Sequence, residues 1–188
     1  TTGSQNVGIG YGTLGGGDTT GSDNIAIGTT AADALTTGAC NIAIGLNALG
    51  AATVGHTNVA IGKDAMLGVT TASATGNIAI GQLAMCGVAA TEGDHNVAIG
   101  GYAMAYALTT GNDNVAIGRN SMDALTTGNC NVAIGRQALG AATIGLLNVA
   151  IGKEAMGAVT TGQADENIAI GGCALAGAAG TTGDKNIV

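Results

Sequence analysis

The chain has 188 residues, a length that suits one globular domain, but its composition does not suit a conventional core. It contains 35 glycines, three tyrosines, and no proline, phenylalanine or tryptophan. Hydrophobic residues make up 46% and charged residues 9%, the reverse of the balance in disordered chains. Collagen is excluded because proline is absent and glycine does not recur at every third position. We therefore expect a thin, regular structure that buries small apolar side chains.

The formal net charge of −7 excludes the strongly basic surfaces that bind nucleic acid. No apolar run approaches the roughly 20 residues of a membrane-spanning helix, and no signal peptide is recognised. Because the chain begins at Thr1 without methionine, we expect it to be a segment of a longer protein.

One pentapeptide, Asn-(Val/Ile)-Ala-Ile-Gly, recurs along the whole chain and is called the motif below. It starts at Asn24, Asn41, Asn58, Asn77, Asn96, Asn114, Asn131, Asn148 and Asn167, with a variant at Asn6 that has Gly8 instead of alanine, and a truncated copy at Asn186. By subtraction, successive starts lie 18, 17, 17, 19 and 19 residues apart, and the same five spacings then follow again. We therefore predict one repeat domain, 1–188, made of two five-coil blocks at about 6–95 and 96–185.

Each motif predicts a β-strand. Its Val/Ile and its second Ile point to one face and its Ala to the other, because side chains alternate along a strand. No charged residue falls inside any copy, so we expect both faces to be buried. The glycine then ends the strand. The predicted fold class is all-β, a parallel β-solenoid (β-roll) of about ten coils of 17–19 residues.

A second small–large pair follows each strand, for example Ala48-Leu49 and Ala65-Met66. We interpret it as a return strand whose Leu or Met fills the coil. A helical turn is the alternative, because Ala, Leu and Met favour helices. An isolated helix shorter than about 12 residues is marginal, however, so a strand or an irregular return is favoured.

Stacking the coils at about 4.8 Å would place the motif asparagines above one another. Such stacked amides form hydrogen-bonded ladders, although Asn also suits turns, and the two roles are compatible. The predicted ladder comprises Asn6, Asn24, Asn41, Asn58, Asn77, Asn96, Asn114, Asn131, Asn148, Asn167 and Asn186.

The two apolar faces of each strand have different needs. One lines the inside of its own coil, and the other requires a separate partner, most simply further copies of the same chain around a symmetry axis. We therefore expect a homotrimer. The residues assigned to this oligomer or core face are Ile27, Ile44, Ile61, Ile80, Ile99, Ile117, Ile134, Ile151 and Ile170.

Asn-Val-Ala-Ile-Gly, followed by Ala and then by Thr-Gly before the next Asn, resembles the head repeats of trimeric autotransporter adhesins. It is equally similar to repeats of phage and prophage tail-fibre proteins. The resemblance spans essentially the whole chain, although adhesin coils are usually shorter. It implies a left-handed, trimeric β-roll in an extracellular, cell-surface or virion setting, with a cell-surface or glycan receptor as a candidate partner.

We find no sequence pattern for catalysis, a metal or another cofactor. His56 and His95 have no Cys or Glu at zinc-ligand spacing. Neither a Gly-x-Ser-x-Gly elbow nor a Walker loop is present, so we expect no enzyme. Calcium binding by acidic turn residues is the weaker alternative to solvated charges, because the Gly-Gly-x-Gly-x-Asp repeat is missing. These residues are Asp23, Asp94, Asp113, Asp165, Glu166 and Asp184.

The four cysteines offer no obvious intrachain disulfide. Cys40 and Cys130 are equivalent but five coils apart, about 24 Å at 4.8 Å per coil, beyond the roughly 7 Å limit between Cα atoms. Cys86 and Cys173 fall at other positions of the coil. We expect all four to be small buried residues.

Our leading functional hypothesis is a non-catalytic shaft or head segment of an extracellular fibre, a phage tail fibre or a bacterial surface adhesin. A head-to-tail filament is the alternative, because Thr1–Gln5 and Thr181–Lys185 occupy the same phase and open coils invite stacking. A solenoid that binds ice or glycan is the third hypothesis. It rests on threonine pairs, each giving one outward threonine, at 19–20, 36–37, 70–71, 109–110, 126–127, 160–161 and 181–182.

Overall fold

The computed structural model describes residues 3–17, 19–68, 74–87, 93–105, 110–141, 144–158, 165–176, 185 and 187–188. Ten three-residue strands form one parallel sheet in chain order. They are β1 (Val7–Ile9), β2 (Ile25–Ile27), β3 (Ile42–Ile44), β4 (Val59–Ile61), β5 (Ile78–Ile80), β6 (Val97–Ile99), β7 (Val115–Ile117), β8 (Val132–Ile134), β9 (Val149–Ile151) and β10 (Ile168–Ile170). No helix occurs in these ranges, so the predicted all-β parallel solenoid is confirmed.

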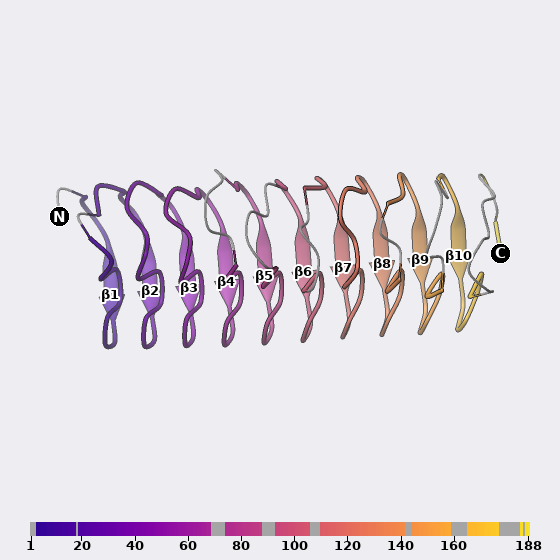
Figure 1. The fold of residues 1–188 in the computed structure, drawn as a ribbon, viewed down its shortest axis with the longest axis horizontal. Coiled ribbons are helices and arrows are strands. Elements are labelled where there is room, and N and C mark those ends of the chain that lie inside the picture. The colour runs from indigo at the N-terminus through magenta and orange to yellow at the C-terminus, as the bar shows by residue number, and fades with distance from the viewer. Residues whose placement is uncertain are drawn as a thin grey trace.

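The coils stack in register, motif position upon motif position. Ile42 pairs with Val59, and Ala43 with Ala60. Figure 1 shows the strands side by side along the long axis, with the two ends of the chain at opposite ends of the rod. Because each coil bonds only its neighbours, every position of the motif becomes a column that runs the length of the molecule.

Glycine closes each strand for two reasons that Gly45 illustrates. Its φ of +133° lies in a region that other residues avoid. A Cβ atom there would also lie 2.6 Å from the carbonyl oxygen of Gly62 in the next coil. The repeated glycine is therefore required both by the turn and by the close stacking of turns.

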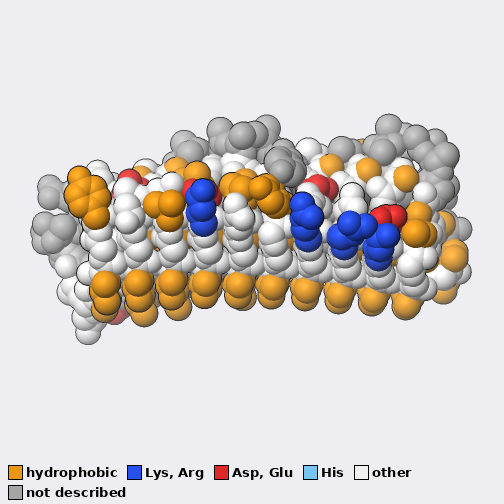
Figure 2. Space-filling view, turned by 90° about the horizontal axis from the view of Figure 1, so that it is seen from below, with side chains coloured by type: hydrophobic (Ala, Val, Ile, Leu, Met, Phe, Trp, Pro, Cys, Tyr) orange, Lys and Arg blue, Asp and Glu red, His pale blue; other side chains and the backbone are white. Residues whose placement is uncertain are grey.

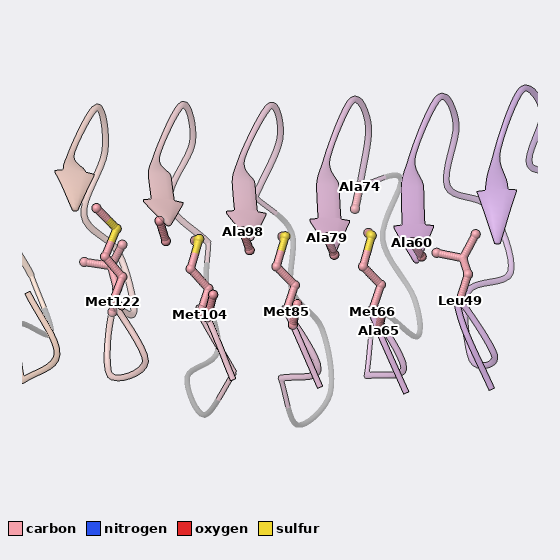
Figure 3. Packing of buried hydrophobic residues seen from close by; sticks show 14 of the residues in the cluster. Leu49, Ala60, Ala65, Met66, Ala74, Ala79, Met85, Ala98, Met104 and Met122 are labelled. Carbon is pink, nitrogen blue, oxygen red and sulfur yellow. The ribbon is translucent and has the colours of Figure 1, made fainter. Parts of the chain in front are cut away.

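The interior of the solenoid is narrow and is filled by three columns of side chains. The middle Ala of each strand from β2 onward is fully buried, and so is an Ala or Ser in the following turn of most coils. The third column is Leu or Met, which lies beside the strand alanines (Figure 3). Its fully buried members include Leu49, Met66, Met104, Met122, Leu139 and Met156. The predicted role of Leu and Met as fillers is confirmed.

The predicted return strand is wrong. The segment after each strand consists of turns, and from β2 onward two non-glycine residues of these turns adopt left-handed backbone angles. In the third coil these are Asn47 (φ 53°) and Leu49 (φ 54°). The N–H of Asn47 donates to Thr29 of the preceding coil (3.0 Å) and that of Leu49 to Ala65 of the following coil (2.9 Å). The chain thus reverses sharply and still bonds to both neighbouring coils without an extended strand.

Candidate functional site

The outer side of the sheet is a continuous strip of Val and Ile side chains, which we call the aliphatic face. Alternation along the strand sends the Ala inward, so both flanking residues point outward, and each is half-buried or exposed. Figure 2 shows hydrophobic side chains in an unbroken row along the rod. The face comprises Val7, Ile9, Ile25, Ile27, Ile42, Ile44, Val59, Ile61, Ile78, Ile80, Val97, Ile99, Val115, Ile117, Val132, Ile134, Val149, Ile151, Ile168 and Ile170.

The sequence left open which side of the strand lines the coil, and the structure answers this. All nine isoleucines named as the oligomer or core face lie on the aliphatic face and not in the interior. Exposure reaches 58% at Ile9, 36% at Ile134 and 61% at Ile170. The expectation that both sides are buried therefore fails for the single chain, because no described residue packs over the outer side of the sheet. Contiguous apolar strips of this kind mark interaction surfaces.

Two columns of variable residues border the aliphatic face. The upstream edge is the residue immediately before the motif Asn, and the downstream edge is the residue immediately after the motif Gly. The upstream edge is mostly exposed and includes Asp23, Cys40, His95, Asp113, Cys130, Leu147 and Glu166. The downstream edge holds four basic residues, Lys63, Arg119, Arg136 and Lys153. Its other members are uncharged, namely Tyr11, Thr29, Leu46, Gln82, Gly101 and Gly172. The residues on the two edges thus differ in charge and size from coil to coil, whereas the aliphatic face between them repeats.

The motif asparagines form a buried ladder from Asn6 to Asn167. In each step the backbone N–H of one Asn donates to Oδ1 of the preceding Asn, at 2.8–3.0 Å. The side-chain nitrogen of Asn41, for example, donates to Oδ1 of Asn24 (3.1 Å) and to the carbonyl of Gly55 (2.7 Å). Buried amides are costly unless bonded, and this arrangement bonds them. Asn186 lies outside the described residues.

A second ladder, which we did not predict, lies two residues before each motif Asn. There the side chain accepts a hydrogen bond from a backbone N–H of the preceding coil. Examples are Asp94 Oδ1 from Thr75 (2.8 Å), Asn112 Oδ1 from Asp94 (2.8 Å) and Asp165 Oδ1 from Leu146 (2.9 Å). The accepting members are Ser, His, Asp and Asn, so their shared property is only the ability to accept a hydrogen bond. Ala39 and Leu146 occupy the same position without a side-chain acceptor and interrupt the ladder.

The histidines and acidic residues considered as metal ligands are distributed along the solenoid. His56 accepts a backbone hydrogen bond at Nδ1 from Ala39 (3.1 Å), and His95 lies exposed on the upstream edge. Asp23, Asp113 and Glu166 are also exposed, and Asp184 lies outside the described residues. Among the residues that the structure describes, no three His, Cys, Asp or Glu side chains gather as a metal site, and no membrane-crossing helix is found.

The prediction that the cysteines are buried is wrong for three of the four. Cys40, Cys130 and Cys173 are exposed, and Cys86 is half-buried. The first two stand on the upstream edge, where the backbone is left-handed and the side chain leaves the coil. Burial raises the pKa of the Cys86 thiol, whose sulfur donates to the carbonyl of Ala105 (3.4 Å).

Two carboxylates have shifted pKa values. Burial raises the pKa of Asp123, although the side chain of Asn120 donates to it at 2.9 Å. The neighbouring Lys153 lowers the pKa of Glu154, through a hydrogen bond and through its charge. Glu154 also lies 3.2 Å from Arg136. Both shifts have structural causes and neither residue lies in an enclosed pocket.

The outward threonine row is short. Thr19 is buried, whereas Thr20, Thr37, Thr110 and Thr127 are exposed. The row is then interrupted, since Val54 and Ile144 take the same position in the coils after Thr37 and Thr127. The pairs 70–71, 160–161 and 181–182, and Thr109, lie outside the described residues. A regular array for ice or glycan is therefore limited to pairs of neighbouring coils in the described chain.

Two open hollows lie away from the aliphatic face. One, of about 250 Å³, is lined by Thr127, Ile144, Gly145, Leu146 and Asp165. The other, of about 200 Å³, is lined by Gln137, Glu154, Gly157, Ala158 and Ala176. The aliphatic face with its two edges is therefore the strongest candidate for a functional surface. No protein-family model, no curated protein and no solved structure matches the chain.

Proposed function

We propose that the chain is a non-catalytic structural segment of an extracellular fibre, a phage tail fibre or a bacterial surface adhesin, which assembles as a homotrimer through the aliphatic face. The resemblance of its motif to the repeats of such fibres supports the extracellular setting. The regular stack of coils supports a structural role, because ten equivalent strands repeat in register along the rod.

The observation that carries the proposal is the exposure of two aliphatic ranks on every strand, with no charged residue among them. Val and Ile on an open sheet face water at a cost of about 25 cal/mol per Å² of apolar surface. A flat, repetitive apolar face is also an aggregation hazard unless a specific partner covers it. A second and a third copy offer a surface of the same chemistry and the same spacing.

The dimensions of the face set how much surface two or three copies would bury. Nine spacings of about 4.8 Å make it about 43 Å long, and two ranks about 6.6 Å apart make it about 10 Å wide, or about 430 Å² per chain. Two chains would bury only about 860 Å², below the roughly 1,200 Å² at which stable interfaces begin. Three chains around an axis would bury about 1,300 Å² in total, shared among three interfaces of about 430 Å² each, so the area by itself does not decide between two copies and three. The choice of three copies rests on the resemblance of the motif to the repeats of trimeric fibres.

The test is a lysine substitution in the middle of the face. Ile117→Lys places an ammonium group where aliphatic side chains should meet, and we expect the oligomer to dissociate into single chains. Thr127→Lys is the matched control, because it adds the same charge to an exposed position elsewhere on the same coil. Both are compared with the unmodified chain by light scattering coupled to size exclusion.

Three outcomes are informative. A trimer that Ile117→Lys dissociates and Thr127→Lys preserves supports the proposal. Polymers of variable length favour the head-to-tail filament instead, and a trimer that tolerates Ile117→Lys places the interface elsewhere. Circular dichroism of both variants checks that the solenoid itself remains folded.

A further inference from the structure

The two edges of the aliphatic face carry opposite charge. The downstream edge holds Lys63, Arg119, Arg136 and Lys153, which are four of the five Lys and Arg residues of the chain. Figure 2 shows the basic side chains in a row of their own, parallel to the hydrophobic row. The upstream edge holds Asp23, Asp113 and Glu166, with Asp94 and Asp165 one residue earlier. Its one basic member is Lys185, which pairs with Glu166 at 3.7 Å.

Most of the downstream cations already have a carboxylate of their own chain nearby. Lys63 lies 3.7 Å from Asp64, and Arg136 and Lys153 lie 3.2 and 3.3 Å from Glu154. Arg119 is exposed and takes part in no ion pair within the described ranges. Asp113 on the upstream edge is also exposed and likewise forms no ion pair within the described ranges. These two residues flank the same strand, β7, one on each side of the face.

The charges discriminate between the ways in which copies can associate. A rotation axis parallel to the solenoid brings the upstream edge of one copy to the downstream edge of the next, so opposite charges meet. A twofold axis parallel to the strands would place like edges together and acidic columns face to face, which is repulsive. Rotation about an axis along the solenoid also keeps every coil at its own height. Asp113 then meets Arg119, because both belong to the coil of β7.

We propose that copies of this chain associate with their solenoids parallel and in register, and that an ion pair between Asp113 of one copy and Arg119 of the next sets this arrangement. The inference rests on the proposed self-association through the aliphatic face. The face alone defines the register only weakly, because its rungs repeat every 4.8 Å or so and a slip by one coil loses contact only at the ends of the face. The charges on the two edges differ from coil to coil and can therefore define the register.

A charge exchange tests the pairing. Asp113→Arg and Arg119→Asp each place like charges together at every contact, and we expect each to weaken association about 10- to 100-fold, since exposed pairs are individually weak but recur at each interface. The double variant Asp113→Arg/Arg119→Asp restores opposite charges and has the composition of the original chain. We expect it to associate within about threefold of the original, with coupling visible as non-additivity.

Asp23→Arg is the matched control. Asp23 occupies the equivalent place in the first block, but the downstream residue of its own coil is the uncharged Thr29. We therefore expect a change of less than about threefold. The neutral variants Asp113→Asn and Arg119→Gln provide a second set in case a reversed charge disturbs folding, and each is expected to weaken association less than the reversal does.

The readout is the dissociation constant from sedimentation equilibrium at low salt. Weakening by both single variants and rescue by the double variant support the pairing. If the unmodified chain associates and the double variant is no tighter than the two single variants, the pairing is overturned while the proposed trimer stands. If the unmodified chain is monomeric, the proposed self-association is itself contradicted, and the proposed pairing with it.

Discussion

Removing one amide from the buried asparagine ladder should cost a large part of the stability of the solenoid. Asn114 is fully buried. Its Oδ1 accepts from the backbone N–H and the side-chain nitrogen of Asn131, both at 3.0 Å. Its Nδ2 donates to the carbonyl of Gly128 at 2.8 Å and to Oδ1 of Asn96 at 3.1 Å. Alanine at this position would end all four contacts.

The magnitude follows from the groups left without a partner. In Asn114→Ala the backbone N–H of Asn131 and the carbonyl of Gly128 lose these bonds inside the coil, where water does not replace them. Each such group costs about 1–3 kcal/mol, so we expect the free energy of unfolding to fall by about 2–6 kcal/mol. Asn112→Ala is the matched control from the same coil, because Asn112 is exposed and water can replace its bond to Asp94. We expect a loss of about 0–1 kcal/mol there.

The assay is urea denaturation followed by circular dichroism, at one fixed protein concentration, because association shifts apparent stability. Hydrogen exchange adds a local readout, since the amide of Asn131 should exchange faster in Asn114→Ala. Equal losses in the two variants would refute the reasoning, as would unchanged protection of the Asn131 amide.

Three further predictions concern single positions. Gly118→Ala should prevent stable stacking, because φ there is +134° and a Cβ would lie 2.5 Å from the carbonyl oxygen of Gly135. Gly101→Ala is the control and should leave the melting temperature unchanged, because a Cβ there would have no neighbour closer than 3.9 Å. Thermal melts of both variants test this. Asp123→Asn should stabilise the fold at pH 7, since burial raises the pKa of this carboxyl and ionisation above that pKa disfavours the folded state. The gain should vanish below the ordinary value of 3.8, and a gain that persists at pH 3 would contradict the cause. In timed alkylation of the native protein, Cys86 should react more slowly than the exposed Cys40, Cys130 and Cys173, and equal rates would contradict the assigned burial.

The position of every strand could be predicted from the motif. Alternation along three residues, a terminal glycine and a spacing of 17–19 residues leave few other structures for a chain of this composition. The inward side was harder to assign, because Ala and Ile are both apolar and the pattern contains no polar residue to mark the solvent side. In the structure, the Leu or Met of the turn after the strand lies beside the strand alanine and fills the interior. The small side chain of alanine therefore lies on the inner side of the strand.

The turns after the strands could not be read from residue preferences. Left-handed angles at Leu49 or Met66 are uncommon for bulky residues. They persist because each turn is bonded to the coils before and after it, an effect of stacking and not of local sequence. Cys40 and Cys130 are exposed because each is a left-handed residue directly before the motif Asn, where the side chain turns out of the coil. Cys173 lies instead in the turn after β10. The second ladder escaped notice because four residue types share its one property, a hydrogen-bond acceptor.

The candidate surface was predicted in part. The need for a partner follows from a strand that is apolar on both sides, and the structure shows which side is left uncovered. The opposite charges of its two edges were not recognised, because they become columns only when coils of 17, 18 and 19 residues are aligned on the motif. Sequence separation alone does not show that residues such as Asp113 and Arg119 border the same face.

The central claim is that the aliphatic face holds copies of this chain together, and the mass of the unmodified protein in solution tests it most directly. Sedimentation equilibrium over a wide range of concentrations should give a species of three times 17.8 kDa. A single chain of 17.8 kDa at every concentration would contradict the claim.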